Sequence, residues 1–135
     1  MSYLLDTNVL SELRKKPPAT AVARWVEGVS ESALFISALV VGEVRQGIER
    51  IRPRDPVQAQ VFEQWLAGLK HDFSDRILPL TSTEAEAWGR LNAPTPLPVI
   101  DGLQAATAMV HGLTFVTRDA SRLAQTGIPL LDPWN

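Results

Sequence analysis

Four acidic residues stand beside apolar runs of this chain, each near the start or the end of an expected helix or strand: Asp6, Glu43, Asp101 and Asp119. If they share one pocket, each pair of charges repels by about 4 kcal/mol at a separation of ~4 Å and an effective dielectric of about 20. Such a pocket is stable only when it takes up protons or cations, and hard divalent cations prefer oxygen ligands. One or two Mg²⁺ or Mn²⁺ ions held there would activate a water and shield the charge that develops on a phosphate during in-line attack.

Polar side chains accompany these acids at the ends of the expected strands. Thr7 and Asn8 follow the first acid directly, Thr117 lies two residues before the last one, and Ser37 ends another apolar run. Hydroxyl and amide groups near a metal commonly hold its carboxylate ligands or its bound waters by hydrogen bonds. We therefore expect these four residues to orient the acids.

Each acid taken alone also has a purely structural explanation. Asp6 begins the sequence Asp-Thr-Asn, which is a good helix cap. Asp101 fits a charge in the first turn of a helix, where an anion is favoured. Asp119 fits a turn acid or a helix cap, and Glu43 fits a solvated helix residue. Taken together, four separate caps at one sheet edge are less economical than one metal site.

Short apolar runs alternate with longer amphipathic ones, and this alternation predicts the elements that must position the acids. Expected strands span residues 3–5, 33–37, 76–80 and 113–117, with an edge strand at 129–132. Expected helices span residues 8–16, 21–27, 38–52, 57–73, 82–91, 100–111 and 120–126. Strands that alternate with helices imply crossover connections and a mostly parallel sheet of about four or five strands, covered by helices on both faces. Because Asp6 and Asp119 follow strands, they project from the edge where open α/β sheets bind ligands.

The beginning of the helix expected at 82–91 can be read from its polar residues. Ser82 or Thr83 begins it, and Glu86 lies three residues beyond Thr83 as a possible capping-box partner.

The bulk composition is that of an ordinary globular domain. The chain has 135 residues, 45% of them hydrophobic and 21% charged, and no cysteine, which excludes disulfides and thiolate metal sites. No apolar run approaches the ~20 residues that crossing a bilayer requires. We therefore expect a soluble cytoplasmic protein with a single domain over residues 1–135.

The net charge of −2 does not attract nucleic acid to the protein as a whole, so any such binding needs a local basic patch. Basic residues that offer one are Arg14, Lys15, Lys16, Arg45, Arg50, Arg52, Arg54 and Arg118. For each of them, an ordinary solvated surface position remains the alternative explanation. Large apolar side chains around Trp25 and along residues 57–69 suggest core packing or protein contacts.

An ordered set of segments runs nearly from end to end: Leu4-Leu5-Asp6-Thr7-Asn8-Val9-Leu10-Ser11-Glu12, Ile36-Ser37, Gly42-Glu43-Val44-Arg45-Gln46-Gly47-Ile48, Arg76-Ile77-Leu78-Pro79, Ala87-Trp88-Gly89, Asp101, Ala105-Ala106-Thr107-Ala108, His111-Gly112-Leu113-Thr114, Val116-Thr117-Arg118-Asp119 and Asp132-Pro133-Trp134-Asn135. With this set the chain resembles the PIN-domain ribonucleases, and among them the VapC-like toxins of prokaryotic toxin–antitoxin pairs, especially the FitB-like branch. The Asp-Thr-Asn start is a weak signal by itself, whereas the ordered set is a strong one.

The resemblance implies a PIN-like fold and a metal-dependent endoribonuclease. The family's four acids fall on the four acidic residues named above, and its hydroxyl positions fall on Thr7 and Thr117. Some relatives carry asparagine at the position of Asp119. The resemblance also implies an RNA substrate, a homodimer, and an antitoxin protein that blocks the acidic pocket, often with a basic side chain. Gln104 and Leu123 depart from the family pattern, and we expect the changes to affect packing more than chemistry.

Other functions compete with this one. A phosphate-transfer receiver domain also uses acids at strand ends with Mg²⁺, but it needs a lysine near the last strand, and the chain has only Lys15, Lys16 and Lys70. A PIN-type nuclease that processes RNA without being a toxin stays open. A non-catalytic module that binds ligands through its acidic pocket also stays open, although the presence of all four acids speaks against it.

Overall fold

Five short strands form a parallel sheet in the computed structural model, which describes residues 1–135. They are β1 (Tyr3–Leu5), β2 (Leu34–Ser37), β3 (Ile77–Leu78), β4 (Thr114–Val116) and β5 (Leu130–Leu131). Their spatial order is β3-β2-β1-β4-β5, and every neighbouring pair is parallel. The first strand of the chain therefore lies in the middle of the sheet, with β4 as its neighbour although more than a hundred residues separate them in the sequence.

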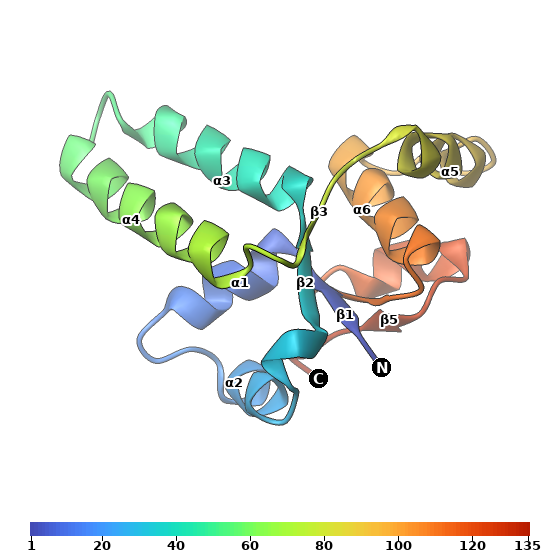
Figure 1. Ribbon diagram of the computed structural model, residues 1–135, viewed down its shortest axis with the longest axis horizontal. Coiled ribbons are helices and arrows are strands. Elements are labelled where there is room, and N and C mark those ends of the chain that lie inside the picture. Colours follow the sequence, from blue (N-terminus) through green and yellow to red (C-terminus); the bar gives the residue numbers. More distant parts are fainter.

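Helices cover both faces of this sheet. They are α1 (Thr7–Arg14), α2 (Thr20–Glu27), α3 (Ala38–Ile51), α4 (Pro56–Asp72), α5 (Ser82–Asn92) and α6 (Val99–Val110), with 3₁₀ helices η1 (Glu31–Ala33) and η2 (Ala120–Thr126). Figure 1 shows α1 to α4 on one side of the sheet and α5 and α6 on the other. The predicted architecture, a mostly parallel sheet of four or five strands between two helical layers, is confirmed. No helix has the length and apolar character that crossing a bilayer requires.

The two residues that end β1 face opposite layers, because side chains alternate along a strand. Leu5 belongs to the larger core cluster, which it shares with residues of α1 to α4. Leu4 belongs to the smaller cluster under α6, together with Phe115 of β4. Both leucines are almost completely buried, so the end of β1 is held from both sides, and the residue that follows it has a fixed position.

Helix α6 lies close against α5 because it carries a glycine at the point of contact. A Cβ atom added to Gly102 would lie 3.0 Å from Nε1 of Trp88 in α5, which is too close for an unstrained contact. Asp101 precedes this glycine in the first turn of α6. The close approach of the two helices therefore also positions Asp101, the third of the four candidate acids.

Several local predictions differ from the structure. The strand expected at 76–80 covers only Ile77–Leu78. The segment 120–126 is a 3₁₀ helix instead of an α-helix. Helix α1 ends at Arg14, two residues before the predicted end, and Pro17 follows soon after. The cap of α5 is Thr81, and its capping-box partner is Glu84, whose carboxylate accepts the Thr81 N–H at 2.7 Å. The predicted pair of Thr83 and Glu86 was wrong because both residues already lie inside the helix, which begins directly after Thr81.

Candidate metal centre

The four acids come from four different elements that meet at one edge of the sheet. Asp6 directly follows β1 and caps α1. Asp119 lies three residues beyond the end of β4, the neighbour of β1, and precedes η2. Asp101 lies in the first turn of α6 and Glu43 in the second turn of α3. The carboxyl ends of parallel strands share an edge, so the topology brings together residues that are far apart in the sequence.

Three of the acids converge within the reach of one ion. Asp6, Asp101 and Asp119 each offer a carboxylate oxygen, and these three oxygens lie within 4.8 Å of one another. Glu43 lies outside this group of three but lines the same pocket, which has a volume of about 420 Å³. The donor set consists of oxygen alone, without histidine or cysteine, and this is the set that Mg²⁺, Mn²⁺ and Ca²⁺ prefer. The residues present therefore fit a hard divalent cation.

Asp6 is the most firmly held of the acids. Its Oδ1 accepts the N–H of Thr7 at 2.7 Å and the amide Nε2 of Gln104 at 3.1 Å, and its Oδ2 accepts the hydroxyl of Thr117 at 2.7 Å. Only 6% of its surface is exposed. Three donors fix the orientation of a carboxylate that has almost no contact with solvent, as expected of a preorganised ligand.

The hydroxyl of Thr7 plays a similar part for Glu43. It donates to Oε1 of Glu43 at 2.6 Å, so the residue after the first acid orients the second one. The amide Nδ2 of Asn8 lies at 3.5 Å from Oδ2 of Asp119, a long contact with the fourth acid. Thr7, Asn8 and Thr117 thus each contact one of the acids. Ser37 ends β2 as predicted, but its buried hydroxyl has no hydrogen-bond partner and contacts none of the acids.

Gln104 contacts Asp6, and sequence reasoning missed this contact. We expected this departure from the family pattern to affect packing more than chemistry, yet its side chain is completely buried and its amide donates directly to Asp6. Its Oε1 has no partner. The signal was available in the helical spacing, because residue 104 lies three positions after Asp101 and therefore on the same side of α6.

Burial and mutual repulsion raise the pKa of three of the acids above their ordinary values. Desolvation is the largest cause for Asp6, for Glu43 and for Asp101. The charges also act on one another, because Asp6 raises the pKa of both Glu43 and Asp101. A site with this property carries more negative charge than its surroundings compensate, and a cation that binds there relieves the excess.

One arginine already lies against the acids. Nη2 of Arg122, in η2, is 2.9 Å from Oδ2 of Asp101 and 3.1 Å from Oδ2 of Asp119. Its side chain remains 56% exposed. Sequence reasoning did not single out Arg122, because only the turn after Asp119 directs it back to the pocket. The guanidinium supplies part of the positive charge that the acids require.

We expect the substitution Arg122→Gln to raise the affinity for Mn²⁺ by up to about fivefold. A cation that binds the acids must displace the guanidinium, and an exposed ion pair contributes up to about 1 kcal/mol. Calorimetric titration of the metal-free protein with MnCl₂ measures the change. Arg90→Gln is the matched control, because Arg90 pairs loosely with Glu86 at 3.8 Å on the surface of α5. Equal affinities of the two variants would contradict the competition.

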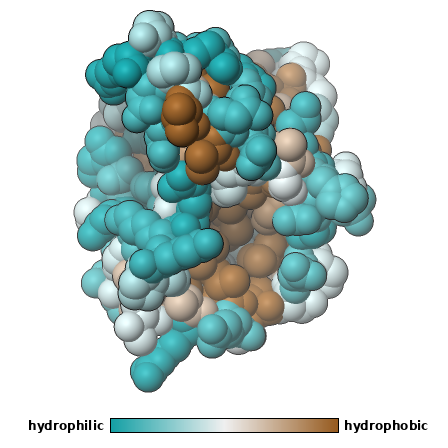
Figure 2. Space-filling model, turned by 90° about the vertical axis from the view of Figure 1, so that its left-hand side faces the viewer, coloured by the Kyte–Doolittle hydropathy of each residue, from teal (hydrophilic) through white to brown (hydrophobic).

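Two pockets with mostly apolar linings lie between the helices of the α1–α4 layer. One, of about 280 Å³, includes Phe62 and Trp65 of α4 and shares Thr7, Ser11 and Glu43 with the acidic pocket. The other, of about 240 Å³, lies between α1, α2 and the end of α4. Figure 2, which views this side of the molecule, shows apolar residues between hydrophilic ones. The acidic pocket therefore opens towards an apolar groove.

Comparison with known proteins gives a consistent result. The PIN domain family matches residues 3–128. A protein named VapC ribonuclease Y4jK from Sinorhizobium fredii is 34% identical over 137 residues, which cover 97% of this chain and 96% of that protein. The crystal structure of FitAcB from Neisseria gonorrhoeae superposes with a TM-score of 0.89 at 28% identity, covering 98% of this chain and 99% of that one. A toxin–antitoxin complex from Klebsiella pneumoniae superposes with a TM-score of 0.72 at 26% identity and covers 99% of both chains.

Proposed function

The chain belongs to the PIN-domain family, and from this premise we propose that it is an endoribonuclease that hydrolyses phosphodiester bonds of RNA with Mg²⁺ or Mn²⁺. The resemblance found in the sequence is confirmed by the family match over residues 3–128 and by the similarity to a VapC ribonuclease. The observation that carries the proposed chemistry is the convergence of three carboxylate oxygens within 4.8 Å. Their all-oxygen chemistry and the raised pKa of Asp6 and Asp101 support a bound divalent cation.

Each residue of the pocket has a distinct part in this proposal. Asp6, Asp101 and Asp119 would hold the cation, and Glu43 would complete the site from α3. Bound there, Mg²⁺ or Mn²⁺ would supply an activated water and neutralise the charge that develops on the phosphate. Thr117 fixes the orientation of Asp6, and Thr7 fixes that of Glu43. With both acids held, the pocket needs little rearrangement to accept a phosphate.

We further propose that the protein is the toxin of a type II toxin–antitoxin pair and acts in the cytoplasm. The support comes from its similarity to a VapC ribonuclease and to a structure described as a toxin–antitoxin complex. In this proposal a cognate antitoxin blocks the acidic pocket, and two toxin chains form a homodimer. Val57 and Val61, which are 77% and 46% exposed on α4, offer apolar surface for protein contacts.

Cleavage of single-stranded RNA by the purified protein tests the proposed activity. We expect cleavage with MgCl₂ or MnCl₂ and none when EDTA removes the metal. Asp101→Asn is expected to lose most of this activity. The control Asp75→Asn is expected to keep it, because the side chain of Asp75 is 82% exposed and pairs only with Arg76. Tight Mn²⁺ binding without cleavage of any RNA would contradict the nuclease and favour the non-catalytic binding module.

A further inference from the structure

Five of the ten arginines are already occupied by partners within the protein. Arg45 and Arg52 share the carboxylates of Glu49 and Glu63 between α3 and α4. The others with partners are Arg76, which donates to three backbone carbonyls, Arg90, which pairs with Glu86, and Arg122, which pairs with two of the site's acids. The charge of Arg45 and Arg52 is therefore largely neutralised, and these two arginines are poorer candidates for binding RNA than the sequence indicated.

Arg118 is different, because its guanidinium makes no direct ion pair and yet its position is defined. Its guanidinium carbon lies 4.6 Å from the ring centroid of Trp134, a cation–π contact. Its side-chain N–H groups make no hydrogen bond and no ion pair in the structure. Arg118 and Trp134 both line the pocket that holds Asp6, Asp101 and Asp119.

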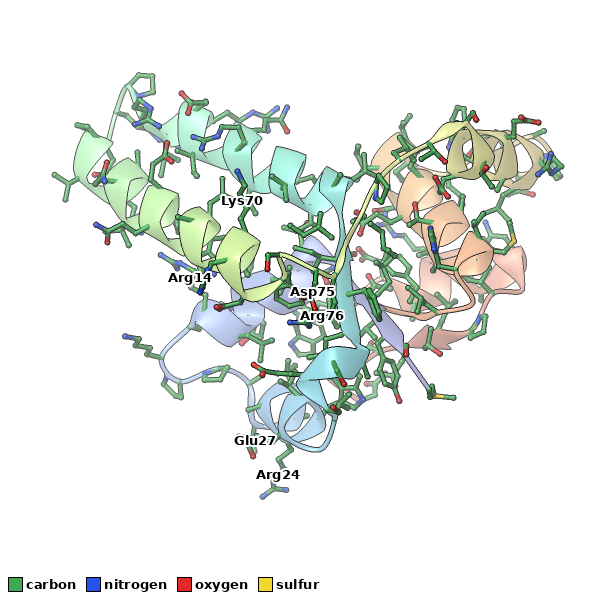
Figure 3. All side chains as sticks on the ribbon, in the orientation of Figure 1. Arg14, Arg24, Glu27, Lys70, Asp75 and Arg76 are labelled. Carbon is green, nitrogen blue, oxygen red and sulfur yellow. The ribbon has the colours of Figure 1, made fainter.

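Arg14 shows a related arrangement at a different place. Its guanidinium carbon lies 4.1 Å from the ring centroid of Phe62 and 5.6 Å from that of Trp65, and it reaches from α1 towards α4 (Figure 3). Arg14 does not line the acidic pocket. Arg118 is thus the arginine of that lining whose donors are free and whose side chain is supported by an aromatic ring.

Trp134 packs against the larger core cluster, and the backbone segment that carries it is held in place. Oδ1 of Asp132 accepts the N–H of Trp134 at 2.9 Å, and the N–H of Thr117 donates to the carbonyl of Leu131 at 3.0 Å. The first bond holds the turn after β5, and the second joins the end of β5 to Thr117, the residue before Arg118. Arg118 and Trp134 therefore lie on two backbone segments that the sheet holds next to each other.

We propose that Arg118, supported by the ring of Trp134, binds a phosphate of the RNA next to the one that is cleaved. This inference rests on the proposed nuclease function and names two further residues of the same site. A guanidinium that lies on an aromatic face keeps the N–H donors in its own plane free. Two of these donors can bind two phosphate oxygens at once. The acids repel a polyanion, and a fixed positive group on the same wall compensates for that repulsion. Trp134 is the positioning residue, and Arg118 makes the contact.

Binding of an end-labelled single-stranded RNA, followed by fluorescence anisotropy, tests the contact in a chain that also carries Asp6→Asn to prevent cleavage. Adding Arg118→Gln is expected to raise the Kd about tenfold. For the loss of one phosphate contact on a single strand, the slope of log K against log salt is expected to become shallower by about 0.7. Trp134→Ala is expected to weaken binding severalfold, and Trp134→Phe to restore most of it, because phenylalanine keeps an aromatic face under the guanidinium.

Arg24→Gln is the matched control, since it removes one arginine charge from the exposed surface of α2, where Arg24 points away from the molecule (Figure 3). We expect it to leave the Kd within twofold. Equal losses for Arg24→Gln and Arg118→Gln would show a general charge effect and overturn the proposal, as would an unchanged Kd and salt slope in Arg118→Gln. Calorimetric titration with MnCl₂ is expected to give the same metal affinity for the wild type and for Arg118→Gln, and a large loss there would also overturn it.

The two proposals fail in different ways. If the wild-type protein cleaves no RNA, the nuclease function is wrong, whatever the binding data show. If the wild-type protein cleaves RNA but Arg118→Gln binds it unchanged, the nuclease stands and the phosphate contact is wrong.

Discussion

The substitution Asp6→Asn is expected to reduce metal-dependent RNA cleavage by at least about 100-fold while the protein stays folded. Loss of a residue that merely supports a metal ligand already costs about 10- to 100-fold in metal affinity or activity, and Asp6 is placed to be a ligand itself. Asparagine caps a helix as well as aspartate does, so α1 keeps its N-terminal cap. Initial cleavage rates with MnCl₂ measure the loss of activity, and circular dichroism of the variant checks that it stays folded.

The same substitution is expected to stabilise the metal-free protein at neutral pH. Burial raises the pKa of Asp6, so the folded state binds this proton more tightly than the unfolded chain does. The charged carboxylate therefore lowers the free energy of unfolding at pH values above its unfolded pKa of about 3.9. This loss of stability grows with pH until the pH exceeds the pKa of Asp6 in the folded state. Asparagine carries no charge and avoids this penalty.

Urea unfolding in EDTA at pH 7 and at pH 3 checks the sign. We expect the Asp6→Asn variant to be the more stable protein at pH 7 and the two proteins to be nearly equal at pH 3, where the wild-type carboxyl is protonated. If the variant cleaves RNA at the wild-type rate, Asp6 is not part of the proposed site. A variant that is less stable than the wild type at pH 7 would contradict the assigned electrostatic cost.

The substitution Phe115→Ala is expected to lower the free energy of unfolding by about 3–5 kcal/mol. Phe115 is completely buried in β4 and packs in the smaller core cluster with Leu4 and Ala105. Removing its ring leaves a cavity between the sheet and α6, and a loss of this size is a large fraction of the roughly 5–15 kcal/mol that stabilise a typical domain. Cleavage is expected to fall together with the folded fraction, because β4 positions Thr117 and Asp119.

Urea denaturation at pH 7 measures this change. The control Leu80→Ala truncates a side chain that is 40% exposed and is expected to change stability by no more than about 0.5 kcal/mol. If both variants lose the same free energy of unfolding, then the smaller cluster is not the tightly packed core that the burial of Phe115 indicates.

The sheet and the meeting of the acids were predictable because both depend on local patterns and one topological rule. The run from Tyr3 to Leu5 and the run from Thr114 to Val116 are short and apolar, and each is followed within three residues by an acid. Parallel pairing then places both acids at the same edge. The helical spacing of apolar residues gave the lengths of α3 and α4 to within two residues at either end.

Long-range side-chain contacts were not predictable, because no periodic pattern records them. Gln104 meets Asp6 across 98 positions of the sequence. Arg45 meets Glu63 only because α3 and α4 form a hairpin, so a residue that looked available for RNA is paired. Arg122 turns back to the acids because η2 is a 3₁₀ helix, whose tighter winding changes the direction of its side chains.

The place of β1 between β2 and β4 has a consequence for the order in which the site is completed during synthesis on the ribosome. Translation delivers the chain from its N-terminus at about 5–20 residues per second. Strands β1 and β2 are available to pair early in synthesis, but β4 and Asp119 emerge only when most of the chain has been made. A nascent chain therefore carries Asp6 and Glu43 before Asp101 and Asp119 have been made, so the acidic pocket is completed only near the end of synthesis.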